Sequence, residues 1–227
     1  MGLIHDFQYR EGAFIPGFLN PIRTELKYCM HDFGFSENFN TLIVAPSANS
    51  KGEIVNMDVR RPIESWESLE DPLLSSGFSW IRLAHAVIAA PSPSHDFLAI
   101  IDLRNGKIIE HVPVPIGTKF FRSRLDSRYL WVGSQTNQLQ SAHVTIIDKN
   151  TLETVRVDSM EPGSSLVDIG FSRDGSHAFV TLADRANDVI VYNTEALNAI
   201  KRFALGKIPT TDNAVDSNQR ESAQWTP

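Results

Sequence analysis

The chain has few of the residues and motifs that carry common catalytic or metal-binding chemistry. Among its 227 residues Cys29 is the single cysteine, which excludes an internal disulfide, a CxxC metal site and a CxxCH attachment for a c-type haem on this chain. The sequence has no GxSxG, P-loop or GxGxxG motif. Its histidines also lack the spacing of a paired metal site. The signatures of serine hydrolases, nucleotide-binding enzymes and c-type cytochromes are therefore missing.

Long hydrophobic runs and an excess of positive charge are missing as well. No run reaches the roughly 18 apolar residues of a membrane span. The first residues, 1–6, do not begin the basic and apolar pattern of a secretory signal, so a complete chain would be cytoplasmic. With 21 basic and 27 acidic residues the net charge is −6, which predicts no nucleic-acid partner. The length fits one domain.

Four segments of the chain repeat the same alternation of short apolar strands and polar turns. The predicted third strand of each segment ends in an Asp or Asn, at Asp58, Asp102, Asp148 and Asn193. These markers are 44, 46 and 45 residues apart. A period of about 40 to 50 residues with several strands per unit is typical of β-propeller blades. The sequence therefore predicts an all-β propeller with four-stranded blades.

The last segment is the most regular. Strands are predicted at 167–171, 177–182, 189–193 and 199–203, and Gly175 supplies the turn between the first two. The segment 31–38 aligns with 167–174 and shares its Asp, Gly, Phe and Ser in the same order. The first and last full units are therefore expected to have one fold.

The predicted propeller covers residues 1–210. Residues 1–30 are expected to form a remnant blade with a short strand at Phe14 and Ile15, and the full blades are 31–77, 78–117, 118–163 and 164–210. About four and a half blades would leave an open arc, whereas propellers close with about four to eight. Three arrangements stay open: the C-terminal part of a longer protein, which we favour, closure with a second copy, or a small closed ring. The polar residues 211–227 are predicted to be disordered.

Several segments resemble the YVTN-type propeller repeat and the haem d1 domain family. The repeat is carried by 171–175, 179–181, 188–192 and 206–210. The segment Met30–Phe35 is similar to the Leu-His-Asp-Gly-Gly-Trp segment of haem d1 domains, in which the histidine stands over the haem, and Ala45–Lys51 is similar to the Asn-rich loop that follows. The resemblance spans residues 28–210. Phe33 and Phe35 stand where that family has Gly and Trp, which, with the missing CxxCH, favours a biosynthesis protein over the nitrite reductase.

His31 is the first candidate site residue. It stands at the start of a predicted innermost strand, where the last blade has Val167, and innermost strand ends converge on the funnel of a propeller. A neutral imidazole there can act as a general base near pH 7. The resemblance implies that His31 faces the tetrapyrrole and its iron. Asp32 is expected either to orient this imidazole or to satisfy amides at the blade edge, and the second role is favoured because Asp168 repeats it without a histidine.

Cationic residues near the blade connections form the second candidate set. Haem d1 and its precursors carry several carboxylates, which Arg and Lys bind through charge-assisted hydrogen bonds. The candidates are Arg82, Lys119, Arg122, Arg124 and Lys207, with His95 as a further candidate at the funnel rim. Solvated surface charge is the alternative for each. The aromatic residues expected to pack between blades are Phe33, Phe35, Phe121, Trp131, Phe171 and Phe179.

The resemblance implies a periplasmic protein that binds haem d1 or a precursor in its funnel. It would act in haem d1 biosynthesis or nitrite reductase maturation during denitrification, with the reductase or other maturation proteins as partners. Any enzymatic activity, redox or on the macrocycle side chains, would follow from the resemblance alone. Two alternatives stay open: a non-enzymatic propeller that binds a protein or peptide, and a fragment of cytochrome cd1 nitrite reductase. Convergence of His31 and the cations on one funnel mouth would favour the tetrapyrrole hypothesis.

Overall fold

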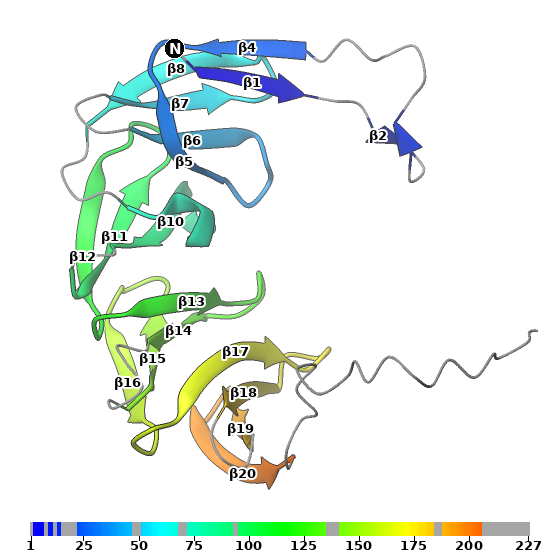
Figure 1. Cartoon of the computed structure of the whole chain (residues 1–227), viewed down its shortest axis with the longest axis vertical. Coiled ribbons are helices and arrows are strands. Elements are labelled where there is room, and N and C mark those ends of the chain that lie inside the picture. Colours follow the sequence, from blue (N-terminus) through cyan, green and yellow to red (C-terminus); the bar gives the residue numbers. More distant parts are fainter. Residues whose placement is uncertain are drawn as a thin grey trace, which may run out of the picture.

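The computed structural model describes residues 2–6, 9–10, 13–14, 22–46, 51–67, 72–92, 95–134, 141–183 and 188–205, and all structural statements refer to these. They form four four-stranded antiparallel sheets and two two-stranded sheets. In each larger sheet the strands lie side by side in chain order. The sheets follow one another along an open arc (Figure 1). The predicted all-β propeller of four-stranded blades is confirmed.

We number the four larger sheets as blades 1 to 4. Blade 1 consists of β5 (Met30–Phe35), β6 (Thr41–Pro46), β7 (Gly52–Asn56) and β8 (Arg61–Trp66). The 3₁₀ helix η1 (Leu74–Ser76) leads into blade 2, which consists of β9 (Phe78–Arg82), β10 (His85–Pro91), β11 (Phe97–Asp102) and β12 (Ile108–Pro113). Blade 3 consists of β13 (Thr118–Arg122), β14 (Tyr129–Ser134), β15 (His143–Asp148) and β16 (Thr154–Ser159). Blade 4 consists of β17 (Ser165–Phe171), β18 (His177–Ala183), β19 (Asp188–Asn193) and β20 (Asn198–Ala204).

A two-stranded sheet stands before blade 1. It pairs β1 (Gly2–Asp6) with β4 (Ile22–Leu26), and β4 leads into β5, so these strands take the places of the third and outermost strands of a further blade. A separate small hairpin pairs β2 (Tyr9–Arg10) with β3 (Ala13–Phe14). The predicted remnant blade is therefore present, but β1 and β4 form it. The strand at Phe14 belongs to the hairpin instead, and Ile15 lies outside the described residues.

The hydrophobic core is divided among the interfaces between neighbouring sheets. Successive side chains of a strand point to opposite faces, so Ile43 and Ile54 of blade 1 pack toward blade 2, whereas Leu42 and Val55 pack toward the β1–β4 sheet. Similar clusters fill the interfaces of blades 2 and 3 and of blades 3 and 4. Trp131, fully buried, contributes to the last of these. A single blade cannot bury both of its faces, so each blade depends on its neighbours.

An Asp or Asn side chain closes the turn after the third strand of every blade. Asp148 Oδ1 accepts hydrogen bonds from the backbone N–H groups of the residues two and three positions later, at 2.8 and 3.1 Å. Asn193 and Asn56 form the same Asx turn, and Asp102 bonds the second residue after it. The marker of blade 1 is therefore Asn56, and the prediction of Asp58 was wrong by two residues. The corrected spacings are 46, 46 and 45 residues.

The arc places the innermost strands β5, β9, β13 and β17 on its concave side (Figure 1). Each blade has four antiparallel strands, so all innermost strands run in the same direction and begin on the same face of the propeller. We call the face where the innermost strands begin the near end, and the opposite face, where they finish, the far end. Within the described residues no helix is long and apolar enough to cross a membrane.

Candidate functional site

Three innermost strands carry a β-bulge at the same position. The pairing register shifts at His31 in β5, at Lys119 in β13 and at Val167 in β17. A bulge adds one unpaired residue and re-aims the local side chains. His31 therefore occupies the position of Val167, as predicted from the alignment, and its side chain is exposed at the near end of blade 1.

Asp32 links blade 1 to blade 2. Its Oδ2 accepts hydrogen bonds from the Ser75 backbone N–H at 2.9 Å and from the Ser75 hydroxyl at 3.0 Å. Its other oxygen accepts the N–H of Phe33. The equivalent Asp168 also reaches a neighbouring blade, through an ion pair at 3.0 Å with Arg122. These contacts favour the structural role that the sequence suggested for Asp32.

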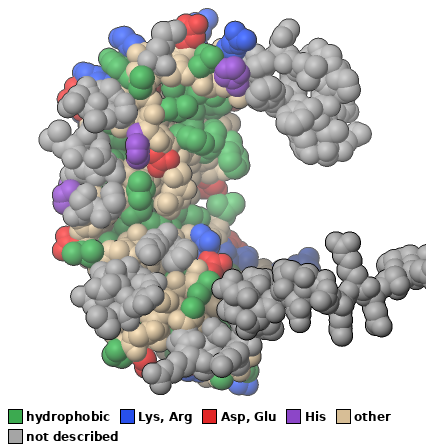
Figure 2. Space-filling view, in the orientation of Figure 1, with side chains coloured by type: hydrophobic (Ala, Val, Ile, Leu, Met, Phe, Trp, Pro, Cys, Tyr) green, Lys and Arg blue, Asp and Glu red, His purple; other side chains and the backbone are tan. Residues whose placement is uncertain are grey.

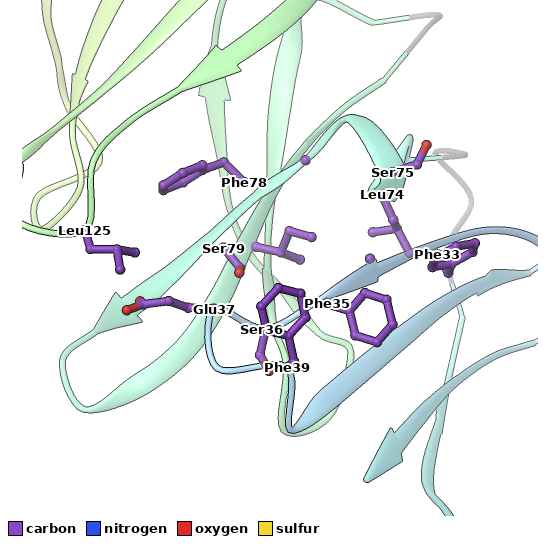
Figure 3. A pocket seen from close by; sticks show the side chains of 13 residues that line it. Phe33, Phe35, Ser36, Glu37, Phe39, Leu74, Ser75, Phe78, Ser79 and Leu125 are labelled. Atoms are coloured by element: carbon purple, nitrogen blue, oxygen red, sulfur yellow. The ribbon is translucent and has the colours of Figure 1, made fainter. Parts of the chain in front are cut away.

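A hollow of about 520 Å³ opens on the concave side between blades 1 and 2. Glu37 and Leu125 lie at one end of it, and Phe33, Leu74 and Ser75 lie at the other (Figure 3). Phe33 is 46% exposed and Leu125 70% exposed, so both present apolar surface to the hollow. The remaining lining residues are Gly34, Phe35, Ser36, Phe39, Gly77, Phe78, Ser79 and Ile88.

The hollow has an aromatic wall and a closely packed floor. The ring centroids of Phe33 and Phe35 are 5.9 Å apart, and those of Phe35 and Phe39 are 5.7 Å apart. A Cβ at Gly34 would lie 2.8 Å from Ile88 Cδ1 and 3.0 Å from the Leu74 carbonyl oxygen. Glycine is therefore required here for β5 to approach η1. The result is a concave, largely apolar surface of the kind that binds small molecules.

The arginine candidates all have partners within the protein. Arg122 pairs with Asp168, and both side chains are about half exposed. Arg124 binds Asp126 and donates to two backbone carbonyl oxygens of blade 4. Arg82 donates from Nε to the carbonyl oxygen of Asn150 at 2.9 Å. An exposed ion pair contributes only about 0–1 kcal/mol, so Arg122 can exchange its partner at little cost.

The predicted site residues lie on both faces of the propeller, some at the near end and some at the far end. His31 lies at the near end, as does His95, which is exposed in the loop between β10 and β11 and hydrogen-bonds Ser92. Arg82 is the last residue of β9 and Arg124 follows β13, so both lie at the far end. An innermost strand of five or six residues separates the ends by roughly 17–20 Å. The side chain of Lys119 and the whole of Lys207 lie outside the described residues.

The aromatic predictions are partly confirmed. Phe121 and Trp131 are buried between blades, and Phe35 and Phe171 pack partly against interface clusters. Phe33 is 46% exposed in the hollow and Phe179 is 37% exposed, so the predicted packing role of these two was wrong. Figure 2 shows hydrophobic side chains gathered along the inner rim of one half of the arc, with basic and acidic side chains beside one another farther along it.

Sequence reasoning missed four residues that line the hollow. Glu37, Phe39 and Leu125 belong to the turns after β5 and β13, and Phe78 begins β9. The available signal was their position: turns between the first and second strands of successive blades meet at one end of a propeller. In the part of the chain that the structure describes, no group of three or more His, Cys, Asp or Glu residues is placed to hold a metal ion.

The stacked four-stranded sheets define a β-propeller protein, and comparisons with known proteins agree. The chain is 29% identical over 187 residues to the dihydro-heme d1 dehydrogenase of Pseudomonas aeruginosa, covering 82% of this chain and 38% of that protein. It is also similar to a solved structure of dihydro-heme d1 dehydrogenase NirN in complex with DHE. That match has a TM-score of 0.72 and 28% identity, and covers 88% of this chain and 42% of the other.

Two further solved structures share the fold alone. The Dos1 propeller matches with a TM-score of 0.59 at 13% identity, over 80% of this chain and 49% of the other. The hydrazine synthase of Kuenenia stuttgartiensis matches with a TM-score of 0.58 at 13% identity, over 86% of this chain and 53% of the other.

The model of the cytochrome D1 heme domain family matches residues 19–215. The chain therefore belongs to that family, as its resemblance to haem d1 domains implied. It spans about two fifths of the length of the dihydro-heme d1 dehydrogenases that it matches.

Proposed function

We propose that this chain is the part of a periplasmic tetrapyrrole-binding protein that holds haem d1 or a precursor during haem d1 biosynthesis or nitrite reductase maturation. Membership of the cytochrome D1 heme domain family carries the proposal. The dihydro-heme d1 dehydrogenase relatives favour the biosynthesis branch. Nitrite reductase or another maturation protein would receive the product.

The residues of the concave side fit a macrocycle. The apolar face of a macrocycle needs a largely apolar hollow of hundreds of Å³, and the hollow beside Phe33 has about 520 Å³. Its carboxylates require cations, and Arg122 has a weak, exposed ion pair that a ligand carboxylate can replace. When bound, the group would supply redox chemistry at its ring and iron.

His31 is the residue that we assign to the iron side of the macrocycle. Its imidazole is exposed, and the residue lies at a β-bulge near the start of an innermost strand. Asp32, whose carboxylate binds Ser75, would hold the local backbone of β5 rather than exchange protons.

One observation favours a second function, that of a non-enzymatic propeller that binds a protein or peptide. His31 and two of the candidate cations lie at opposite ends of the innermost strands, so those residues do not converge on one funnel mouth. Arg82 and Arg124 are also engaged with the protein's own carbonyl and carboxylate oxygens. A protein partner needs no such convergence.

A titration of the purified protein with haem d1 and with haem b separates the two functions. The tetrapyrrole proposal predicts saturable binding of haem d1, with an altered absorption spectrum for His31→Ala. His111→Ala, which changes an exposed histidine in the outermost strand of blade 2, is the matched control and should leave the spectrum unchanged. Absence of saturable binding by either haem would reject the proposal in favour of the protein-binding function.

A further inference from the structure

A lysine is buried between blades 2 and 3 at a position where the other blades have uncharged residues. Lys149 is only 6% exposed and directly follows Asp148, the marker of blade 3. The equivalent residues are Met57 in blade 1, Leu103 in blade 2 and Thr194 in blade 4, and all four donate the same backbone hydrogen bond to a carbonyl oxygen at or just before the start of the second strand. None of the other three blades needs a charge at this position, so the ammonium group of Lys149 needs another explanation.

The ammonium group of Lys149 has unused hydrogen-bonding capacity. Its Nζ donates to the Arg124 carbonyl oxygen at 3.0 Å and lies 5.9 Å from the centre of the Phe78 ring. An ammonium has three donors, and burying one without a charged partner is costly. Among the described residues no carboxylate lies within ion-pair distance of it; Glu37 and Asp126 act on it from farther away. Asp126 already accepts hydrogen bonds from Nε and Nη2 of Arg124.

Lys149 lines a second hollow that adjoins the first. This far-end hollow has about 260 Å³ and is walled in part by Trp80 and Ile81. It shares Glu37 and Leu125 with the larger aromatic hollow. In Figure 3 these two side chains stand at the same end of the larger hollow. An apolar surface and a cation with spare donors thus lie next to each other.

We propose that the far-end hollow binds a carboxylate through Lys149 while the apolar body of the same ligand lies against Phe39, Phe78 and Leu125. A carboxylate oxygen beside Nζ supplies the missing anionic acceptor in a water-poor place, where charge-assisted hydrogen bonds are strong. Glu37 carries the same charge as the ligand and competes with it. The ligand class is an apolar carboxylic acid, either a free small molecule or the carboxylate edge of a tetrapyrrole.

The test is calorimetric titration of the folded protein with 1-naphthoate and with its neutral analogue 1-naphthalenemethanol. We expect saturable binding of naphthoate, at least about tenfold weaker for the alcohol and for Lys149→Met, which corresponds to about 1.4 kcal/mol. Lys149→Met should fold, because Met57 already occupies the equivalent position in blade 1. Glu37→Gln should tighten naphthoate binding. Lys107→Met, at an exposed turn of blade 2, is the matched control and should change nothing.

Equal affinity for acid and alcohol, or for wild type and Lys149→Met, would overturn the proposal. The two ligand sources are separated by repeating the titration in the presence of haem d1. Loss of naphthoate binding would identify the carboxylate edge of the tetrapyrrole as the occupant, and unchanged binding would identify a free acid. The inference does not rest on the proposed function, since a protein that binds naphthoate through Lys149 but no haem d1 would reject only the latter.

Discussion

Replacing Asp148 by alanine is expected to destabilise the protein far more than replacing it by asparagine. The Asp148 carboxylate is buried, accepts the N–H groups of Asn150 and Thr151, and pairs with Arg128. Asparagine keeps an oxygen for both N–H groups, as Asn193 does in blade 4. Alanine keeps none, so it leaves two amides and an arginine without their acceptor.

The two costs can be estimated from these contacts. Hydrogen bonds to a charged group contribute about 1.5–3 kcal/mol each, and removing one member of a buried pair costs about 3–5 kcal/mol. Asp148→Ala should therefore cost about 3–5 kcal/mol. Asp148→Asn loses only the pairing with Arg128, whose side chain is mostly exposed, and should cost about 1 kcal/mol or less. For a protein of this size 1 kcal/mol shifts the Tm by about 2–4 °C.

Urea and thermal unfolding of the two variants beside the wild type provide the assay. Asp148→Ala should lower the Tm by roughly 6–20 °C and Asp148→Asn by no more than about 4 °C. Equal losses for both variants would refute the argument, because they would mean that the ion pair, rather than the Asx turn, stabilises this position.

The difference in stability between the wild type and Asp148→Asn should depend on pH. Burial raises the pKa of Asp148, but the Asn150 and Thr151 N–H groups and Arg128 outweigh it, so the pKa is lowered overall. A lowered carboxyl pKa stabilises the folded state above the ordinary aspartate range, and this stability is lost as the pH falls through the folded pKa. The difference between wild type and Asp148→Asn should therefore shrink in acid.

Three further predictions concern the hollows. Gly34→Ala should lower the free energy of unfolding by about 1–3 kcal/mol, because the new Cβ would meet Ile88 and Leu74. Gly170→Ala, with open space around the new Cβ, should be nearly neutral, and equal urea midpoints for the two variants would contradict this. A double-mutant cycle of Asp32→Ala and Ser75→Ala should give a coupling energy of about 0.5–1 kcal/mol, and strictly additive losses would show that this contact does not join the blades. Burial lowers the pKa of Lys149, so the charged lysine destabilises the folded state. Lys149→Met should therefore unfold at a higher urea concentration than the wild type at pH 7, and this difference in stability should shrink as the pH rises toward the ordinary pKa of lysine. A stability difference that does not change with pH would contradict the prediction.

The repeat made the fold predictable, because strands and turns are encoded by residues that are adjacent in the sequence. The strands of the last blade were predicted to within two residues at either end, since strand alternation and the turn at Gly175 are encoded in adjacent residues. The β1–β4 sheet was missed because its two strands are separated by residues 7–21 and only their pairing reveals them. The error at Asp58 arose because Asp58, two residues after Asn56 in the same turn, is as typical of a turn in sequence as the Asn56 that closes it.

The site was less predictable, because it depends on contacts between blades. The equivalence of His31 and Val167 was predicted from the alignment, but the β-bulge that both strands carry there was not. In contrast, Ser75 as the partner of Asp32 is 43 residues away, and no local pattern joins the two. Leu125 reaches the hollow from blade 3, and Lys149 lies at a position that is uncharged in the other blades, so the role of both residues required the stacked arrangement of the blades.

Hydrogen exchange of backbone amides with and without haem d1 tests the central claim most directly. A tetrapyrrole on the concave side should slow exchange in β5, in η1 and in the first residues of β9, and leave the outermost strands β8, β12 and β16 unchanged. Absence of any change, or slower exchange confined to those outermost strands, would contradict binding on the concave side of the propeller.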